Sequence, residues 1–115
     1  MKSPITTHVL DTSRGTPAVG VKAILEVHTA SKEWKELARG ETNTDGRISD
    51  LLPDNTKLMP GTYRLTFLTA SYYHSVGVEG FYPYIHVVFE LKDTTTHYHV
   101  PLLLSPFGYS TYRGS

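Results

Sequence analysis

Two histidines near the C-terminus, His97 and His99, are the first candidates for chemistry in this sequence. They lie two residues apart in a segment of strand-like composition, and residues at that spacing in a strand point to the same face. That outer face also carries Pro101 and Leu103, a composition typical of a surface that contacts something else. The opposite face carries the predicted core side chains, which are Tyr98, Val100, Leu102 and Leu104.

The chemistry of this histidine pair is open from the pattern alone. Imidazole titrates near neutral pH, so either ring can act as a general acid or base. A His-x-His pair can also supply two ligands for a zinc ion, with a third ligand from elsewhere in the chain. In the plainest interpretation, the two histidines are partly exposed strand residues without a task.

His8 and Arg47 are weaker candidates when each is taken alone. If Val9 faces the core, His8 lies on the outer face of its strand together with Thr6. Arg47 directly follows an Asp-Gly pair at positions 45–46, which is typical of a turn. An exposed strand histidine and an arginine beside a hairpin are common features of protein surfaces.

The C-terminal end is rich in aromatic residues. Residues 106–115 read PFGYSTYRGS, with a tyrosine, an arginine and a free carboxylate in the last four positions. Most chain ends are polar and frayed. This end is either a last edge strand with a frayed tip, or a segment that brings Tyr112, Arg113 and the Ser115 carboxylate into a site.

Composition excludes several classes of function. The chain has 115 residues, which predicts one domain over residues 1–115, and its 11 basic and 11 acidic residues give zero net charge. Electrostatic binding to nucleic acid or anionic lipid is therefore not expected. The absence of cysteine excludes disulfides, cysteine nucleophiles and thiolate metal sites. No apolar stretch approaches the ~20 residues of a membrane span, and the start lacks a secretory signal, so we expect a cytoplasmic protein.

The hydrophobic pattern predicts an all-β protein. Fifteen Thr, nine Val and eight Tyr favour strands, and alternation is clearest at residues 19–28 and 61–69. Seven or eight short strands with turn signals between them predict a β-sandwich or barrel. One helix of about two turns is expected at residues 70–76. The predicted strands are residues 5–10, 19–28, 34–41, 47–51, 61–69, 84–91, 96–104 and 109–113.

Three blocks of the sequence resemble one known family. Residues 97–115, which read HYHVPLLLSPFGYSTYRGS, resemble the C-terminal signature of the 5-hydroxyisourate hydrolases, the transthyretin-related protein family. Residues 8–18 resemble that family's N-terminal signature, and residues 44–48 match a third short block. Phe107 stands where tyrosine is common in the family. The resemblance spans essentially the whole chain.

The resemblance implies a fold, an assembly and an activity. The fold is a transthyretin-like β-sandwich with one short α-helix. The assembly is a homotetramer, a dimer of dimers, with active sites in a channel between the dimers. The activity is hydrolysis of 5-hydroxyisourate to 2-oxo-4-hydroxy-4-carboxy-5-ureidoimidazoline in urate catabolism. No metal or organic cofactor is implied.

The resemblance also assigns roles to individual residues. The implied catalytic residues are His8, Arg47 and His99. The implied substrate-binding residues are Tyr112, Arg113, Ser115, His97 and Ser110, and Leu103 falls where the family lines its channel. Opening a cyclic amide needs an activated water, a stabilised oxyanion and a proton for the leaving nitrogen. One of the two catalytic histidines would deprotonate the water while the other orients it or donates a proton, and the arginine would stabilise the oxyanion.

The alternative from another class is a non-catalytic, transthyretin-like module that holds a small planar ligand in the same channel. Transthyretin itself, a hormone carrier of this fold, has other residues at the positions of His8, Arg47 and His99 and lacks the Tyr-Arg-Gly-Ser ending. The resemblance therefore favours the enzyme over the carrier. A structural sandwich module is a third, more distant interpretation.

Overall fold

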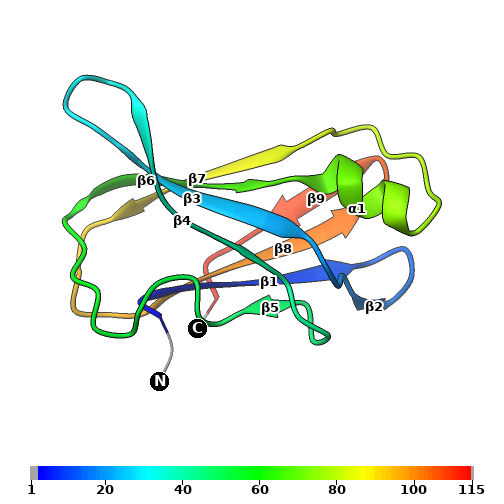
Figure 1. The fold of residues 1–115 in the computed structure, drawn as a ribbon, viewed down its shortest axis with the longest axis horizontal. Coiled ribbons are helices and arrows are strands. Elements are labelled where there is room, and N and C mark those ends of the chain that lie inside the picture. The colour runs from blue at the N-terminus through cyan, green and yellow to red at the C-terminus, as the bar shows by residue number, and fades with distance from the viewer. Residues whose placement is uncertain (1–2, 115) are drawn as a thin grey trace.

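The computed structural model describes residues 3–114 as two β-sheets packed face to face, with a short helix at one end (Figure 1). The first sheet has the strand order β2-β1-β8-β9, and β5 pairs with the free side of β1 at its centre. The second sheet has the order β4-β3-β6-β7. The first sheet comprises β1 (Ile5–Asp11), β2 (Thr16–Pro17), β5 (Arg47–Ile48), β8 (Tyr98–Ser105) and β9 (Gly108–Thr111). The second comprises β3 (Lys22–His28), β4 (Trp34–Glu41), β6 (Gly61–Phe67) and β7 (Ile85–Leu91).

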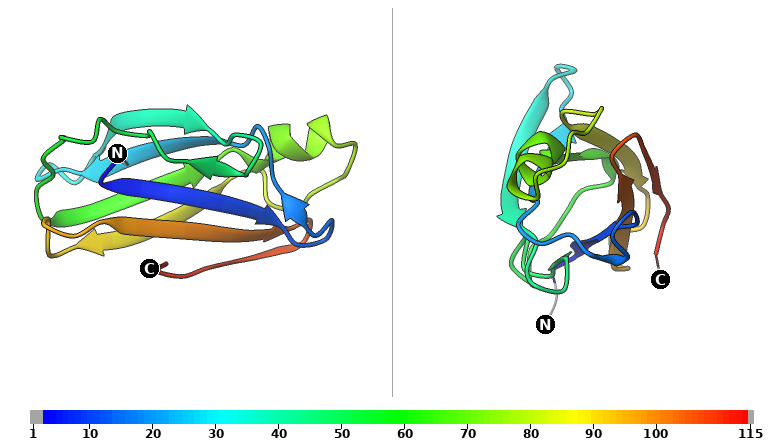
Figure 2. Two further views of the ribbon diagram at one scale, coloured as in Figure 1. Left: turned by 90° about the horizontal axis from the view of Figure 1, so that it is seen from below. Right: turned by 90° about the vertical axis from the view of Figure 1, so that its right-hand side faces the viewer.

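The core lies between the two sheets, which Figure 2 shows as two layers. Side chains alternate across each strand, so one face of each sheet can be apolar while the other stays polar. The predicted core face of residues 98–104 is confirmed, because all four of its side chains are buried. In β6, where the sequence alternates clearly, the alternate residues Tyr63, Leu65 and Phe67 are also buried.

Parallel pairing of β1 with β8 is the feature that positions the site. These strands are about 90 residues apart in sequence, yet they lie side by side with Thr6 opposite His99. On the other side of β1, the short β5 runs antiparallel and places Arg47 opposite His8. Three segments that are remote in sequence therefore present their outer faces together.

The all-β prediction is confirmed, with nine strands in residues 3–114 where seven or eight were expected. The additional strand is β2, two residues between the first two predicted strands. The strand predicted at 19–28 begins only at Lys22, and Val19 is 48% exposed. The reason is local: Gly20 has a φ of +80°, and Thr42 hydrogen-bonds Ala18 and Val21 across this turn.

The single helix of the described chain, α1 (Thr69–Ser75), begins one residue before its predicted start. It buries Tyr72 and Tyr73 against the end of the sandwich. The Tyr72 hydroxyl donates a hydrogen bond of 2.7 Å to the buried Asp11 carboxylate at the end of β1. No helix in residues 3–114 is long and apolar enough to cross a membrane.

Candidate active site

A pocket of about 330 Å³ opens on the outer face of the first sheet. It gathers five of the eight site residues predicted from the sequence, from β1, β5, the start of β8 and the segment after β9. Its lining is mostly polar, with Pro101 as the one apolar side chain among the described residues. The lining residues are His8, Arg47, His97, His99, Pro101, Tyr112 and Gly114.

A tight turn fixes Arg47 beside His8. The Asn43 side-chain oxygen accepts hydrogen bonds from the backbone N–H groups of Asp45 (2.9 Å) and Arg47 (3.0 Å). Gly46 has a φ of +74°, and a Cβ there would lie 2.5 Å from the Val9 carbonyl oxygen. Only glycine fits this position, which explains the Asp-Gly pair seen in the sequence. The turn returns the chain as β5, directly opposite His8.

The surroundings of His8 favour its neutral form. Burial lowers the pKa of the His8 ring, and the positive charge of Arg47 lowers it further. A hydrogen bond to the Asp45 backbone and the Asp45 carboxylate oppose this shift without cancelling it. Desolvation and a nearby like charge both disfavour an imidazolium. His8 therefore stays neutral to lower pH than an ordinary histidine, beside a permanently charged guanidinium.

His97 and His99 share a hydrogen-bonding partner in Thr6. The Thr6 hydroxyl oxygen lies 2.7 Å from Nδ1 of His99 and 3.0 Å from Nε2 of His97. The two rings are nearly parallel, with centroids 6.3 Å apart and planes 22° apart. The expectation that both histidines lie on one outer face is met by this geometry. Sequence reasoning placed Thr6 on the face of His8 but did not single it out as a site residue.

The segment after β9 closes one side of the pocket. The backbone N–H of Gly114 donates a 2.8 Å hydrogen bond to the His99 carbonyl, and Thr111 donates one of 2.6 Å to the Pro101 carbonyl. A Cβ on Gly114 would lie 2.6 Å from Cδ2 of His99. The glycine of the Tyr-Arg-Gly-Ser ending thus permits close approach to the imidazole. Figure 2 shows this segment running back along β8.

Three predicted site residues are not placed on this pocket. Arg113 stacks its guanidinium over the Tyr98 ring, 4.4 Å from the ring centroid. Ser110 is exposed on β9, opposite Leu103. Ser115 lies outside the described residues. The substrate-binding roles of Arg113, Ser110 and Ser115 stay predictions.

The zinc interpretation has no further support in the described chain. Within residues 3–114, no group of three or more His, Asp or Glu side chains is arranged to hold a metal ion. The side chains that are present offer acid–base chemistry instead. The pocket holds the neutral imidazole of His8, the imidazole of His99 with its hydrogen bond to a hydroxyl, and the guanidinium of Arg47. Such groups can activate a water and stabilise an oxyanion.

Comparison with known proteins identifies the family. The model of the HIUase/Transthyretin family matches residues 5–114. The chain belongs to this family. The mouse protein named 5-hydroxyisourate hydrolase is 49% identical over 114 residues, which cover 98% of this chain and 96% of the mouse protein. The resemblance read from three short blocks is therefore confirmed over nearly the full length.

Solved structures of the HIUase/Transthyretin family agree with the fold. The structure of Klebsiella pneumoniae 5-hydroxyisourate hydrolase superposes with a TM-score of 0.83 at 37% identity, covering 96% of this chain and 98% of that one. Sea bream transthyretin in complex with thyroxine superposes with a TM-score of 0.90 at 34% identity, covering 96% and 94%. The transthyretin-like β-sandwich is confirmed. Because a 5-hydroxyisourate hydrolase and a transthyretin bound to thyroxine both match it, the backbone alone does not distinguish hydrolysis from ligand binding.

Proposed function

We propose that this protein hydrolyses 5-hydroxyisourate in urate degradation, at the pocket formed by His8, Arg47 and His99. The observation that carries the proposal is the meeting of two imidazoles and a guanidinium on one outer face. The relatives named 5-hydroxyisourate hydrolase, at 45–52% identity, support the same reaction. The protein is accordingly a hydrolase that acts on a cyclic amide.

His99 is the general base of the proposed reaction. Burial and the charge of Arg47 both disfavour a positive charge on His8, so His8 accepts a proton less readily. His99 instead takes a proton from the attacking water and returns it to the leaving nitrogen when the ring opens. His8 stays neutral and orients the water or a ring carbonyl by a hydrogen bond. Arg47 stabilises the oxyanion that forms at the attacked carbonyl.

The polar lining of this pocket fits a small ring with several carbonyl groups better than a large aromatic ligand such as the thyroxine bound to sea bream transthyretin. The substrate is a small planar ring with several carbonyl groups, which match a guanidinium and imidazole N–H donors. Tyr112 lines the same pocket and can pack against the ring. A carrier of large aromatic ligands needs a predominantly apolar lining. The alternative of a non-catalytic binding module is therefore the weaker proposal.

The proposed working form is a homotetramer with the pocket between two dimers. At one edge of the first sheet lies β9, and at one edge of the second sheet lies β7. Neither strand has a further strand on its outer side in residues 3–114. Two edges on the same side can pair with a second copy. Phe81 and Phe107 are 68% and 74% exposed near one end, and a surface this apolar favours association. A cytoplasmic location stays a prediction from the sequence.

The test is the decay of freshly made 5-hydroxyisourate. The compound is generated in place from urate and urate oxidase, and its ultraviolet absorbance is followed with and without the protein. We expect accelerated decay that is lost in His99→Ala. The matched control is His86→Ala, which removes an exposed strand histidine from the other sheet. Decay at the spontaneous rate with the folded wild-type protein would overturn the proposed function and favour the binding module.

A further inference from the structure

Thr6 links two histidines that the proposed reaction does not otherwise connect. Its hydroxyl oxygen lies within hydrogen-bonding distance of His97 Nε2 and His99 Nδ1, at 3.0 and 2.7 Å. Parallel pairing places Thr6 opposite His99, and His97 precedes it on the same face. The threonine is only 3% exposed, so the three groups form a short chain shielded from bulk water at its centre.

The chemistry of a hydroxyl makes the protonation of the two rings interdependent. A hydroxyl has one hydrogen to donate and two lone pairs that accept. At most one of the two facing ring nitrogens can therefore act as acceptor toward Thr6, and at least one of them carries a hydrogen. When His99 carries its hydrogen on Nδ1 and donates to Thr6, Thr6 can donate to Nε2 of His97. In that arrangement Nε2 of neutral His99 has a lone pair and can accept a proton.

We propose that Thr6 is a positioning residue that holds His99 in this tautomer and relays its proton to His97; the catalytic part of this inference rests on the proposed function. A proton leaves the attacking water for Nε2 of His99. The Nδ1 hydrogen of His99 passes to the Thr6 oxygen as the Thr6 hydroxyl hydrogen passes to Nε2 of His97. The positive charge then resides on His97, and the reverse transfers return the proton to the leaving nitrogen.

The charges around the pocket favour moving the proton in this direction. Arg47 is opposite His8 in the strand register, and both line the same pocket as the two relay histidines. His8 lies opposite Pro101 in the register of β1 and β8, so His99 is two residues away from that position and His97 is four residues away. At ~3.3 Å per strand residue, the relay moves positive charge about 6–7 Å along β8, away from the position of Arg47. Asp45, in the turn before β5, is an acidic residue whose charge acts on His8. In the described part of the segment after β9, Tyr112 and Arg113 are titratable or charged, and Arg113 stacks on the Tyr98 ring.

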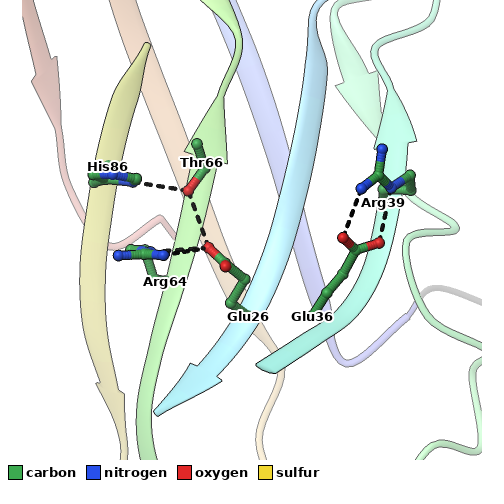
Figure 3. A network of polar contacts seen from close by, with 6 residues as sticks. All are labelled: Glu26, Glu36, Arg39, Arg64, Thr66 and His86. Atoms are coloured by element: carbon green, nitrogen blue, oxygen red, sulfur yellow. Dashed lines mark hydrogen bonds and ion pairs between the residues drawn. The ribbon is translucent and has the colours of Figure 1, made fainter. Parts of the chain in front are cut away.

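The other sheet offers a matched control. Thr66 on β6 is also buried, and its hydroxyl lies 2.8 Å from Nδ1 of His86 on β7 (Figure 3). Its hydroxyl donates to the Glu26 carboxylate at 3.2 Å, and that carboxylate also accepts from Arg64. The carboxylate occupies the Thr66 hydrogen, so Thr66 accepts from His86. This contact resembles that of Thr6 but connects no second imidazole.

The first arm of the test measures ring protonation and needs no turnover. Nitrogen chemical shifts of 15N-labelled histidine, recorded against pH, report the tautomer and titration of each ring. In the wild type we expect His99 to carry hydrogen on Nδ1 when neutral, and His97 and His99 to titrate as a coupled pair. In Thr6→Val, the two rings should titrate independently. Thr66→Val should leave both curves unchanged, and independent titration in the wild type would overturn the coupling.

The second arm measures turnover in the same variants. Thr6→Val and His97→Gln should each lower kcat about 10- to 100-fold, because His99 can then no longer pass its proton to residue 97. KM should change little. Their double variant should be no slower than the slower single variant. Thr6→Ser retains the hydroxyl and should retain most of kcat, and Thr66→Val should retain all of it.

The outcomes separate the two proposals. A wild type that does not hydrolyse 5-hydroxyisourate but shows coupled titration overturns the proposed function and supports the coupling. An active wild type whose Thr6→Val variant keeps full kcat, or whose double variant multiplies the two losses, overturns the relay. A folding defect of Thr6→Val is recognised by comparing its unfolding midpoint with that of Thr66→Val, and His97→Gln and Thr6→Ser then decide the relay.

Discussion

His8 and Arg47 show how one neighbour changes the chemistry of a residue. Both burial and the guanidinium lower the pKa of the His8 ring, with burial the larger cause. A histidine in water titrates near ~6.5, so His8 is neutral at neutral pH and remains so somewhat below it. The proposal that His99 is the general base while His8 stays neutral depends on this lowered pKa of His8. The titration of His8 is therefore a direct test of the proposal.

We predict that the pKa of His8, followed by NMR, lies below that of an ordinary histidine and rises in Arg47→Gln. The rise should be partial, because burial remains when the charge is removed. The lowered pKa also means that His8 contributes stability above about pH 6.5, and that this contribution is lost as the pH falls through the window below. Arg39→Gln is the control, since Arg39 pairs with Glu36 on the other sheet. An unchanged His8 pKa in Arg47→Gln would contradict the electrostatic argument.

Local alternation predicted the faces on which the histidines lie, and the family resemblance gathered them with Arg47 into one expected site. The outer faces of His8, His97 and His99 follow from the strand period, and the Asp-Gly turn before Arg47 is visible in the sequence. The contact of Thr6 with both histidines could not be predicted in this way. It depends on parallel pairing between strands at opposite ends of the chain, and no local pattern specifies the partner or register of such a pair.

At the scale of the elements, a buried hydrogen bond from the Tyr72 hydroxyl to Asp11 connects the short helix α1 to β1. Asp11, at the end of β1, is 1% exposed and accepts hydrogen bonds from Tyr72, Ser13 and the Arg14 backbone. Burial raises the pKa of Asp11, but these hydrogen bonds outweigh it and the net shift is downward. The adjacent Tyr73 hydroxyl is also buried and has no hydrogen-bond partner among the described residues.

The two tyrosines therefore predict opposite outcomes for the same substitution. Tyr72→Phe removes a donor from a buried carboxylate and should lower the free energy of unfolding by about 1–3 kcal/mol at pH 7. Tyr73→Phe removes a hydroxyl without a described partner and should be neutral or stabilising. The measurement is urea denaturation at one fixed protein concentration, because association contributes to apparent stability. Equal losses in both variants would show that the hydrogen bond to Asp11 does not anchor the helix.

The Tyr72→Phe effect should also depend on pH. The folded pKa of Asp11 is below its ordinary value of 3.8, so the carboxylate contributes stability above that pH. The contribution disappears as the pH falls through the folded pKa, where the carboxyl is protonated. The difference between the wild type and Tyr72→Phe should therefore shrink in strong acid.

The strand pattern shows where element prediction succeeds and fails. The strand at 34–41 has the predicted bounds, and the helix differs from its prediction by one residue at each end. The failures are β2, the start of β3 and the end of β5, which was predicted at residue 51 and lies at Ile48. At the start of β3, Thr42 hydrogen-bonds a turn that is remote from it in sequence. Tertiary contacts set these boundaries, and apolar residues such as Val19 carry no local sign of them.

At the scale of the whole molecule, the outer face of β8 must serve two purposes. It carries the histidines of the pocket and, two residues after Pro101, the half-buried Leu103. An apolar residue on the same outer face as a polar pocket has no function in catalysis by itself. It is explained if this face is covered by a second dimer, as the proposed tetramer requires.

Leu103→Glu should therefore separate the tetramer into dimers. A carboxylate at an apolar contact must be desolvated without a partner, which costs several kcal/mol and exceeds what one contact supplies. The expected mass by light scattering falls from about four to about two times the 12.9 kDa of the chain, and hydrolysis falls with it because each pocket loses its cover. Leu37→Glu is the control, since Leu37 is 36% exposed on β4, the far edge of the other sheet. A Leu103→Glu tetramer with full activity would mean that this face is not the contact between dimers, whereas active dimers would mean that the pocket is complete within a dimer.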